Sequence, residues 1–215
     1  MITFWQQENN KLVHLEKDEL AKDKKIWIDA RSVTSGDIKI LEEEYGVYRE
    51  HVLDILDQDE MSRIEPDDEY TLFIFRLPLF NPENDVTYLT IPLGIVLFPD
   101  KIITICWSDC EVLKDISSNR IKNISIENFL TFILKIMSRT DSNFLRYLKE
   151  INRRTITIQG ELQMSVKNNE LIQLFNLEKS LEYFTTSLKS NQLLIEKLYK
   201  MKGIYLDEDQ KDFLE

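Results

Sequence analysis

The 215-residue sequence predicts an α/β protein: a mixed, largely antiparallel sheet of about seven strands flanked by helices, followed by a long antiparallel helical hairpin. Short apolar runs separated by turn residues recur from residue 2 to residue 107, as in sequential strands. Two amphipathic helical patterns stand between the third and fourth runs. After residue 120 the apolar spacing alternates between four and three residues, which is the heptad pattern of packed helices.

The strands are expected in order along residues 1–120, which we take as an α/β sandwich domain. Residues 2–6 and 11–15 form a predicted hairpin, and a third strand follows at 26–29. Four more strands are expected at 61–65, 72–75, 86–98 and 101–107. In the longest of them, Pro92 and Gly94 predict a bulge or an edge position.

Two helices are predicted between the third and fourth strands. Thr34 to Asp37 offer N-cap candidates for the first, and Gly46 ends it. The second, at 50–58, presents an apolar face at Tyr48, Val52, Ile55 and Leu56, and an acidic stripe at Glu50, Asp54 and Asp57. Like charges at this spacing cost about 0.2–0.5 kcal/mol per pair. Either solvation or a bound cation should offset that repulsion.

Residues 121–203 are predicted to form the helical hairpin, with a polar break at 166–169. Asn191 occupies an apolar seam position in the second arm, where one buried polar group can fix the register of two helices. Residues 204–215 resemble the start of a further helix. Because the sequence stops within that pattern, we expect it to be part of a longer protein.

Charge and composition limit the function. Thirty-eight acidic and 27 basic residues give a net charge of −11, which disfavours binding to a nucleic-acid backbone. The charge is compatible with a divalent-cation partner, and plain solubility is the simpler explanation for it. We find neither a signal peptide nor the run of about 18 apolar residues that spans a membrane. Cys106 and Cys110 imply no disulfide framework, so a soluble, cytosolic chain is expected.

Catalytic motifs are lacking, and we predict that the chain is not an enzyme. It has no phosphate-binding loop, no nucleophile elbow, and no zinc-like spacing of His14 and His51. Carboxylates remain. Because Mg²⁺ keeps several waters and takes only one or two carboxylates, a weak site needs little more than Asp54 and an acid from elsewhere. A solvated acidic face explains the same residues.

The order of the motifs adds information. Three motifs follow one another: Val-Leu-Asp-Ile-Leu-Asp at 52–57, Ser-Arg-Ile-Glu at 62–65 and Glu-Tyr-Thr-Leu-Phe-Ile-Phe at 69–75. The fourth comes just before the hairpin and reads Leu-Gly-Ile-Val-Leu-Phe-Pro-Asp-Lys-Ile-Ile-Thr-Ile at 93–105. From about residue 27 onward, the chain resembles the cytosolic N-terminal domain of the CorA family of magnesium transporters. The resemblance implies a homopentamer on the cytoplasmic face of the cell membrane, with stalk and membrane helices beyond residue 215.

The resemblance also implies a role for two carboxylates. In the family, divalent ions bound between neighbouring cytosolic domains favour the closed pore. The motif match puts Asp54 at the first carboxylate of that Mg²⁺ sensor, and Asp141 is the nearest candidate in the first arm of the hairpin. Leu53 stands where family members often have a second acid. A zinc-transporting relative of the same fold, or a soluble scaffold that binds a partner through its hairpin, are the alternatives.

Overall fold

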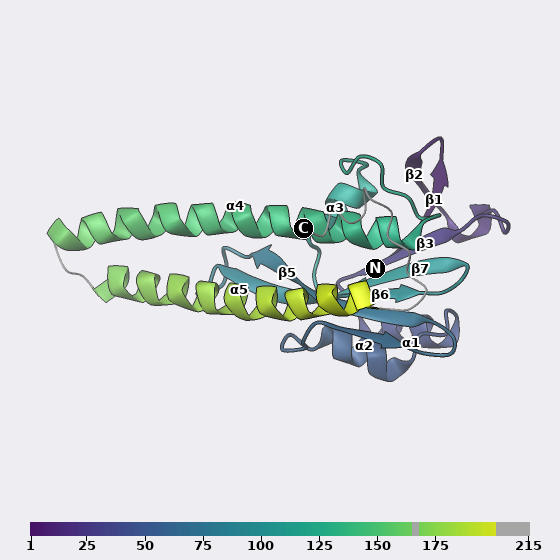
Figure 1. Ribbon diagram of the computed structural model, residues 1–215, viewed down its shortest axis with the longest axis horizontal. Coiled ribbons are helices and arrows are strands. Elements are labelled where there is room, and N and C mark those ends of the chain that lie inside the picture. Colours follow the sequence, from purple (N-terminus) through teal and green to yellow (C-terminus); the bar gives the residue numbers. More distant parts are fainter. Residues whose placement is uncertain (165–167, 201–215) are drawn as a thin grey trace.

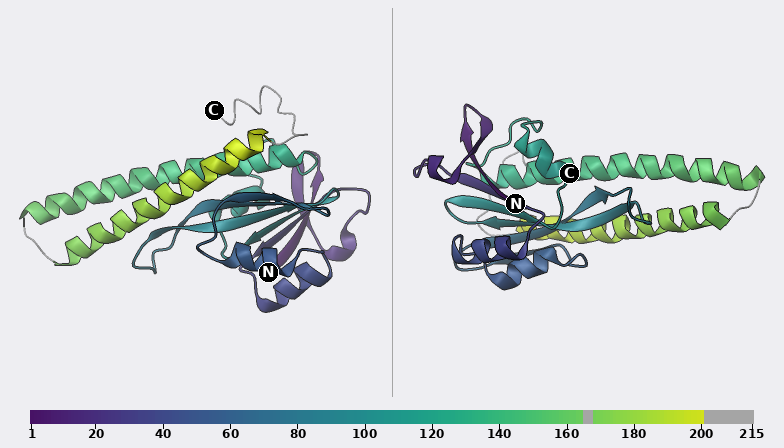
Figure 2. Two further views of the ribbon diagram at one scale, coloured as in Figure 1. Left: turned by 60° about the horizontal axis from the view of Figure 1, so that its bottom comes forward. Right: turned by 180° about the vertical axis from the view of Figure 1, so that it is seen from behind.

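The computed structural model describes residues 1–164 and 168–200 and has three layers (Figure 1). A twisted sheet forms the middle layer. Two short helices, α1 (Ser35–Glu43) and α2 (Arg49–Leu56), cover one face. The other face carries α3 (Glu111–Ser117) and the base of the hairpin formed by α4 (Phe129–Met164) and α5 (Asn168–Lys200), as the turned views show (Figure 2). The fold class predicted from the sequence is confirmed.

The sheet is mixed. Its spatial order is β2-β1-β3-β7-β6-β5-β4, and only the β3–β7 pair is parallel. A 3-10 turn (Lys17–Glu19) links β2 to β3, and the strands are β1 (Ile2–Glu8), β2 (Lys11–Leu15), β3 (Ile26–Arg31), β4 (Arg63–Pro66), β5 (Thr71–Phe80), β6 (Tyr88–Leu97) and β7 (Lys101–Cys106). In the sequence, α1, α2 and strands β4 to β6 stand between β3 and β7. This long connection lets β7 lie beside β3 in the sheet and run parallel to it.

Alternating side chains of the central strands divide the interior into two cores. On β5, Phe73 packs with the hairpin side, whereas Leu72 and Ile74 pack with α1 and α2. Neighbouring Trp27 and Ile28 of β3 divide in the same way. This arrangement requires apolar residues on both faces, which is why the central strands read as continuous apolar runs.

The bulge or edge position predicted at Pro92 and Gly94 is wrong. β6 pairs with β5 in unbroken register and lies inside the sheet. Proline is tolerated because the pairing of β6 with β7 begins one residue later, at Leu93. No backbone N–H is therefore needed from Pro92 to bond β7. Glycine is needed at position 94 for a different reason, because α2 approaches β6 closely there.

Substituting Gly94 with alanine should therefore destabilise the fold. A Cβ there would lie 2.2 Å from Ile55 Cδ1, and Ile55 is fully buried. We expect Gly94→Ala to lower the free energy of unfolding by about 1–3 kcal/mol, as overpacking does. Urea titration measures this change. Adding Ile55→Ala should make the double variant less destabilised than the sum of the single variants.

Gly36 provides the matched control, because a Cβ there meets only Thr34 Oγ1 at 3.8 Å within the first turn of α1. Gly36→Ala should be neutral or stabilising. Equal losses at both glycines would contradict the close approach of α2 to β6.

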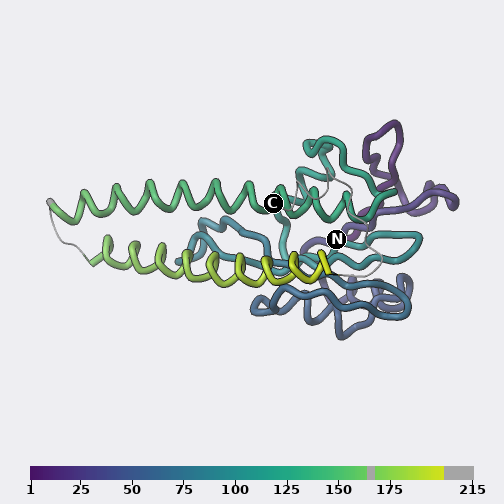
Figure 3. The backbone as a smooth tube through the Cα atoms, viewed as in Figure 1, coloured from purple at the N-terminus to yellow at the C-terminus, as the bar shows by residue number. Residues whose placement is uncertain are grey.

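The hairpin forms a rod that runs well past the sheet (Figure 3). Its outer part has its own core, in which Phe144 and Phe184 meet edge to face with ring centroids 5.0 Å apart. Its base joins the core of the sheet through residues such as Ile136 and Leu198. The domain boundaries at 120/121 and 203/204 stay predictions, and the predicted stalk start at 204–215 lies outside the described residues.

Asn191 does not fix the register of the two helical arms, and that interpretation is wrong. Its amide accepts from the Arg76 N–H (2.9 Å) and from Ser62 Oγ (2.6 Å), and donates to the Arg76 carbonyl (2.9 Å). The reason is that this part of α5 packs on β4 and β5. Asn191 therefore joins α5 to the sheet.

None of the helices in the described ranges combines the length and the apolar character that a membrane crossing requires.

Candidate metal site on the acidic helix

Helix α2 has the two faces that its sequence predicts, except that Tyr48, predicted on the apolar face, is its N-cap and is 41% exposed. Val52 and Ile55 are fully buried against the sheet, whereas Glu50 and Asp57 are exposed. Asp54 lies at the border of the two faces, and its side chain is 44% exposed. The next residue, Ile55, is buried and holds this part of α2 on the sheet, while the Asp54 carboxylate still reaches solvent.

A cation from the protein itself already contacts Asp54. Arg63 of β4 donates from Nη2 to Asp54 Oδ2 at 2.7 Å. The same guanidinium bonds Glu65 from Nε at 3.1 Å and contacts Glu60 from Nη1. Three carboxylates therefore share one guanidinium, which leaves two negative charges in excess. These bonds raise the pKa of Arg63, outweighing the opposite effect of its partial burial, so Arg63 stays charged.

The guanidinium of Arg63 thus partly offsets the repulsion predicted on α2, through its contact with Asp54. Asp54 Oδ1 makes no bond to another described residue, so one oxygen of this carboxylate remains open to an external ligand.

His51 borders this cluster without being a metal ligand. Its Nδ1 lies 2.7 Å from the hydroxyl of Tyr70, which also accepts from the Tyr48 N–H at 3.1 Å. The Tyr70 hydroxyl therefore links the His51 ring to the backbone of Tyr48. Burial is the largest cause that raises the pKa of Tyr70, to about 12. His51 Nε2 faces Glu65 Oε1 at 3.5 Å. Both ring nitrogens are engaged, so the residue holds α2 against β4 and β5.

Asp141 lies on α4, on the other side of the sheet from α2 (Figure 2). Its side chain is exposed and pairs with no other described residue. Although it reaches solvent, desolvation by nearby protein atoms raises the pKa of its carboxyl group. An added cation would offset that cost. The fold does not bring Asp141 together with Asp54 within one chain.

The donor set fits Mg²⁺ only in part. Within residues 1–164 and 168–200, no group of three or more histidine, cysteine, aspartate or glutamate side chains is arranged to hold a metal. Asp54 supplies a hard oxygen, and Glu60 and Glu65 supply local negative charge. That set matches the one or two carboxylates that Mg²⁺ requires, provided that another chain or water completes the shell.

Arg63 is the residue that the sequence interpretation missed. The alternation in Ser-Arg-Ile-Glu places Arg63 and Glu65 on one face of a strand, which signals their pairing. Nothing in the sequence signals that β4 returns alongside α2, so the contact with Asp54 emerges only in three dimensions.

The site thus belongs to a mixed seven-stranded sheet that carries a two-helix rod on one face and the acidic helix α2 on the other. The sequence gives the family directly, since the model of the CorA-like Mg²⁺ transporter proteins matches residues 22–215. The chain belongs to that family.

Individual proteins agree with this assignment. The cobalt/magnesium transport protein CorA of Methanocaldococcus jannaschii is 26% identical over 193 residues, which cover 87% of this chain and 60% of that protein. The chain therefore spans about 60% of the length of this relative.

Solved structures share the fold. The soluble domain of CorA from the same organism superposes with a TM-score of 0.81 at 22% identity, covering 99% of this chain and 85% of that one. The cytoplasmic domain of ZntB from Vibrio parahaemolyticus gives 0.72 at 14% identity, with the same coverage. At these identities the likeness concerns the fold alone. The expectation that the chain is not an enzyme rests instead on its membership of a transporter family.

Proposed function

We propose that this chain is the cytosolic, Mg²⁺-sensing domain of a CorA-type divalent-cation transporter, in which Asp54 binds the ion at a contact between neighbouring subunits. One observation carries the proposal: Asp54 is half-exposed, has one open oxygen and lies in a cluster with excess negative charge. A single chain does not complete the site. A second subunit in a ring, pentameric in the proposal, would complete it.

The physical mechanism is electrostatic. Acidic faces on adjacent subunits repel each other until a divalent cation lies between them, so ion binding is coupled to the spacing of subunits. The ion therefore favours one arrangement of the ring, and its loss favours another. Asp141 is the proposed partner carboxylate from the neighbouring subunit, because it is exposed and unpaired among the described residues.

The test is Mg²⁺-dependent protection from limited proteolysis, measured in the intact transporter. We expect Asp54→Ala to weaken this protection, with at least a tenfold higher Mg²⁺ concentration needed for half-protection, about 1.4 kcal/mol. Glu50→Ala is the matched control, because it removes an exposed carboxylate from the same helix. Protection that is unchanged in Asp54→Ala would remove this residue from the sensor.

A zinc-transporting relative is the second candidate function, since the ZntB domain shares the fold. Zinc prefers imidazole nitrogen and thiolate sulfur. Here Cys106 and Cys110 are both buried, and both nitrogens of His51 are engaged. The proteolysis assay separates the two functions. Half-protection by Zn²⁺ far below the required Mg²⁺ concentration, and independent of Asp54, would favour the zinc function. No response to either ion would favour a scaffold.

A further inference from the structure

A second charged site lies on the opposite face of the sheet, between α3 and α4. A pocket of about 410 Å³ lies there, and its lining includes Glu111, Asp115, Arg120, Lys122, Lys135 and Arg139. Four of these residues are cationic and two are acidic, in a chain whose net charge is −11. A locally positive pocket on an acidic protein indicates an anionic ligand.

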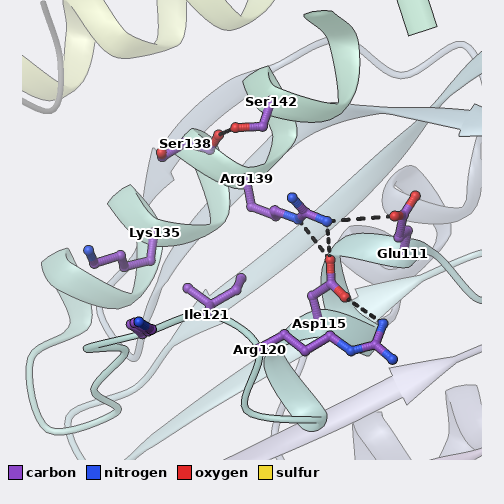
Figure 4. Close-up of a pocket in the computed structure, with 9 residues that line it drawn as sticks. Glu111, Asp115, Arg120, Ile121, Lys135, Ser138, Arg139 and Ser142 are labelled. Atoms are coloured by element: carbon purple, nitrogen blue, oxygen red, sulfur yellow. Dashed lines mark hydrogen bonds and ion pairs between the residues drawn. The ribbon is translucent and has the colours of Figure 1, made fainter. Parts of the chain in front are cut away.

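The two acids pair with arginines, so Arg120 and Arg139 of the pocket are partly engaged. Asp115 is buried and pairs with Arg139 (Nε–Oδ2, 2.7 Å) on one side and Arg120 (Nη1–Oδ1, 3.2 Å) on the other (Figure 4). Glu111 is held by Arg146, which donates from Nη1 at 2.8 Å. This contact lowers the pKa of Glu111. The acids therefore orient the arginines. Arg139 also bonds Asp115 and faces Glu111 from Nη2, so within the described part of the chain the donors left for a ligand are Nη1 of Arg139 and Nε and Nη2 of Arg120.

The helix places the remaining groups. Lys135, Ser138, Arg139 and Ser142 are spaced i, i+3, i+4 and i+7 on α4, so they share the face that lines the pocket. Figure 4 shows Lys135 on one side of Ile121, and Arg139 with Asp115 and Glu111 on the other. Two cationic ends separated by an apolar residue suit a ligand with more than one anionic group.

We propose that this pocket binds a small molecule carrying a diphosphate or triphosphate group. Arginine forks match phosphate oxygens, lysine adds point charge, and the volume lies in the range of small-molecule sites. An extended polyanion such as a nucleic acid fits less well, because the acidic remainder of the surface would repel it. The pocket lies on the face of the sheet that carries α3 and α4, opposite to α2 and Asp54, and two of its residues, Arg139 and Ser142, are close in the sequence to Asp141.

Isothermal titration calorimetry of the 215-residue chain, at low ionic strength and with EDTA to remove divalent ions, tests the proposal. The probes are inorganic diphosphate, ATP and orthophosphate. We expect saturable binding of diphosphate and ATP, and at least tenfold weaker binding of orthophosphate. ATP binding tighter than diphosphate would identify a nucleotide as the ligand, and equal affinities would identify the diphosphate group alone.

The variant Lys122→Gln/Lys135→Gln should weaken diphosphate binding at least tenfold, and circular dichroism should show an unchanged fold. The control Lys39→Gln/Lys189→Gln removes the same charge from exposed positions on α1 and α5, and it should bind like the wild type. Absence of saturable binding, orthophosphate binding as tight as diphosphate, or equal weakening in both double variants would overturn the proposal.

Discussion

Replacing Arg76 by leucine is expected to lower the free energy of unfolding by about 3–5 kcal/mol, the largest loss that we predict for a single side chain. Arg76 lies in β5 and is only 7% exposed. Its guanidinium donates to the carbonyl oxygens of Gln58 (2.8 Å) and Glu60 (2.6 Å) in the α2–β4 loop. It also donates to Thr90 of β6 and Ser187 of α5.

One buried side chain thus joins three parts of the fold: the acidic loop, the sheet and the second arm of the hairpin. Leucine would leave the two loop carbonyls and the Ser187 hydroxyl without this donor, and each lost partner in a buried place costs about 1–3 kcal/mol. Burial lowers the pKa of Arg76, which nearby acids, led by Asp59, partly offset. The charge is retained because oxygen atoms surround it.

Urea titration gives the loss of stability, and hydrogen exchange localises it. Amides of residues 57–60 should exchange faster in Arg76→Leu, whereas those of α1 should not. Arg49→Leu is the control, because Arg49 lies on the exposed face of α2 and, among the described residues, pairs only with Glu42 at 3.4 Å. It should change stability by no more than about 0.5 kcal/mol. If Arg76→Leu lowers the free energy of unfolding by less than about 1 kcal/mol, Arg76 does not hold the loop, the sheet and α5 together as we propose.

The second large effect is on the affinity for Mg²⁺. Replacing Arg63 should raise this affinity, whereas replacing Asp54 should lower it. Removing the guanidinium by Arg63→Gln leaves Asp54, Glu60 and Glu65 without their shared cation. We expect the affinity for Mg²⁺ to rise about tenfold, since a partly exposed unit charge at this range contributes on the order of 1–2 kcal/mol.

Calorimetric titration of the transporter with Mg²⁺ measures this increase. Arg49→Gln is again the matched control, because it removes one positive charge from the neighbouring helix surface and contacts none of the three carboxylates. Its affinity should change less than about twofold. An affinity for Mg²⁺ that falls or stays constant in Arg63→Gln would mean that the ion does not use this cluster.

Much of the fold follows from local patterns. The apolar runs predict every strand, and the two faces of α2 are correct at Val52 and Ile55. Helix α3 was not predicted, because its seven residues are too few for a periodic pattern to show. Asn191 shows another limit: heptad spacing predicts a buried position but not which element buries it, and here the sheet replaces the other helical arm.

The site was predictable only in its first residue. Asp54 stands out from the spacing on one helix and from the family resemblance. Arg63, which sets the local charge, comes from a strand whose return alongside α2 depends on the packing of the whole sheet. The anion pocket depends on contacts between α3 and α4, which lie in separate stretches of the chain.

The central claim is that Mg²⁺ at Asp54 holds neighbouring subunits at a defined spacing. The most direct measurement is the distance between spin labels on adjacent subunits of the transporter, attached at Lys39→Cys on exposed α1, since both native cysteines are buried. We predict a narrow distance distribution with Mg²⁺, a broad one after chelation, and a broad one in both conditions when Asp54→Asn is added. Identical distributions with and without Mg²⁺ in the otherwise native chain would contradict the claim.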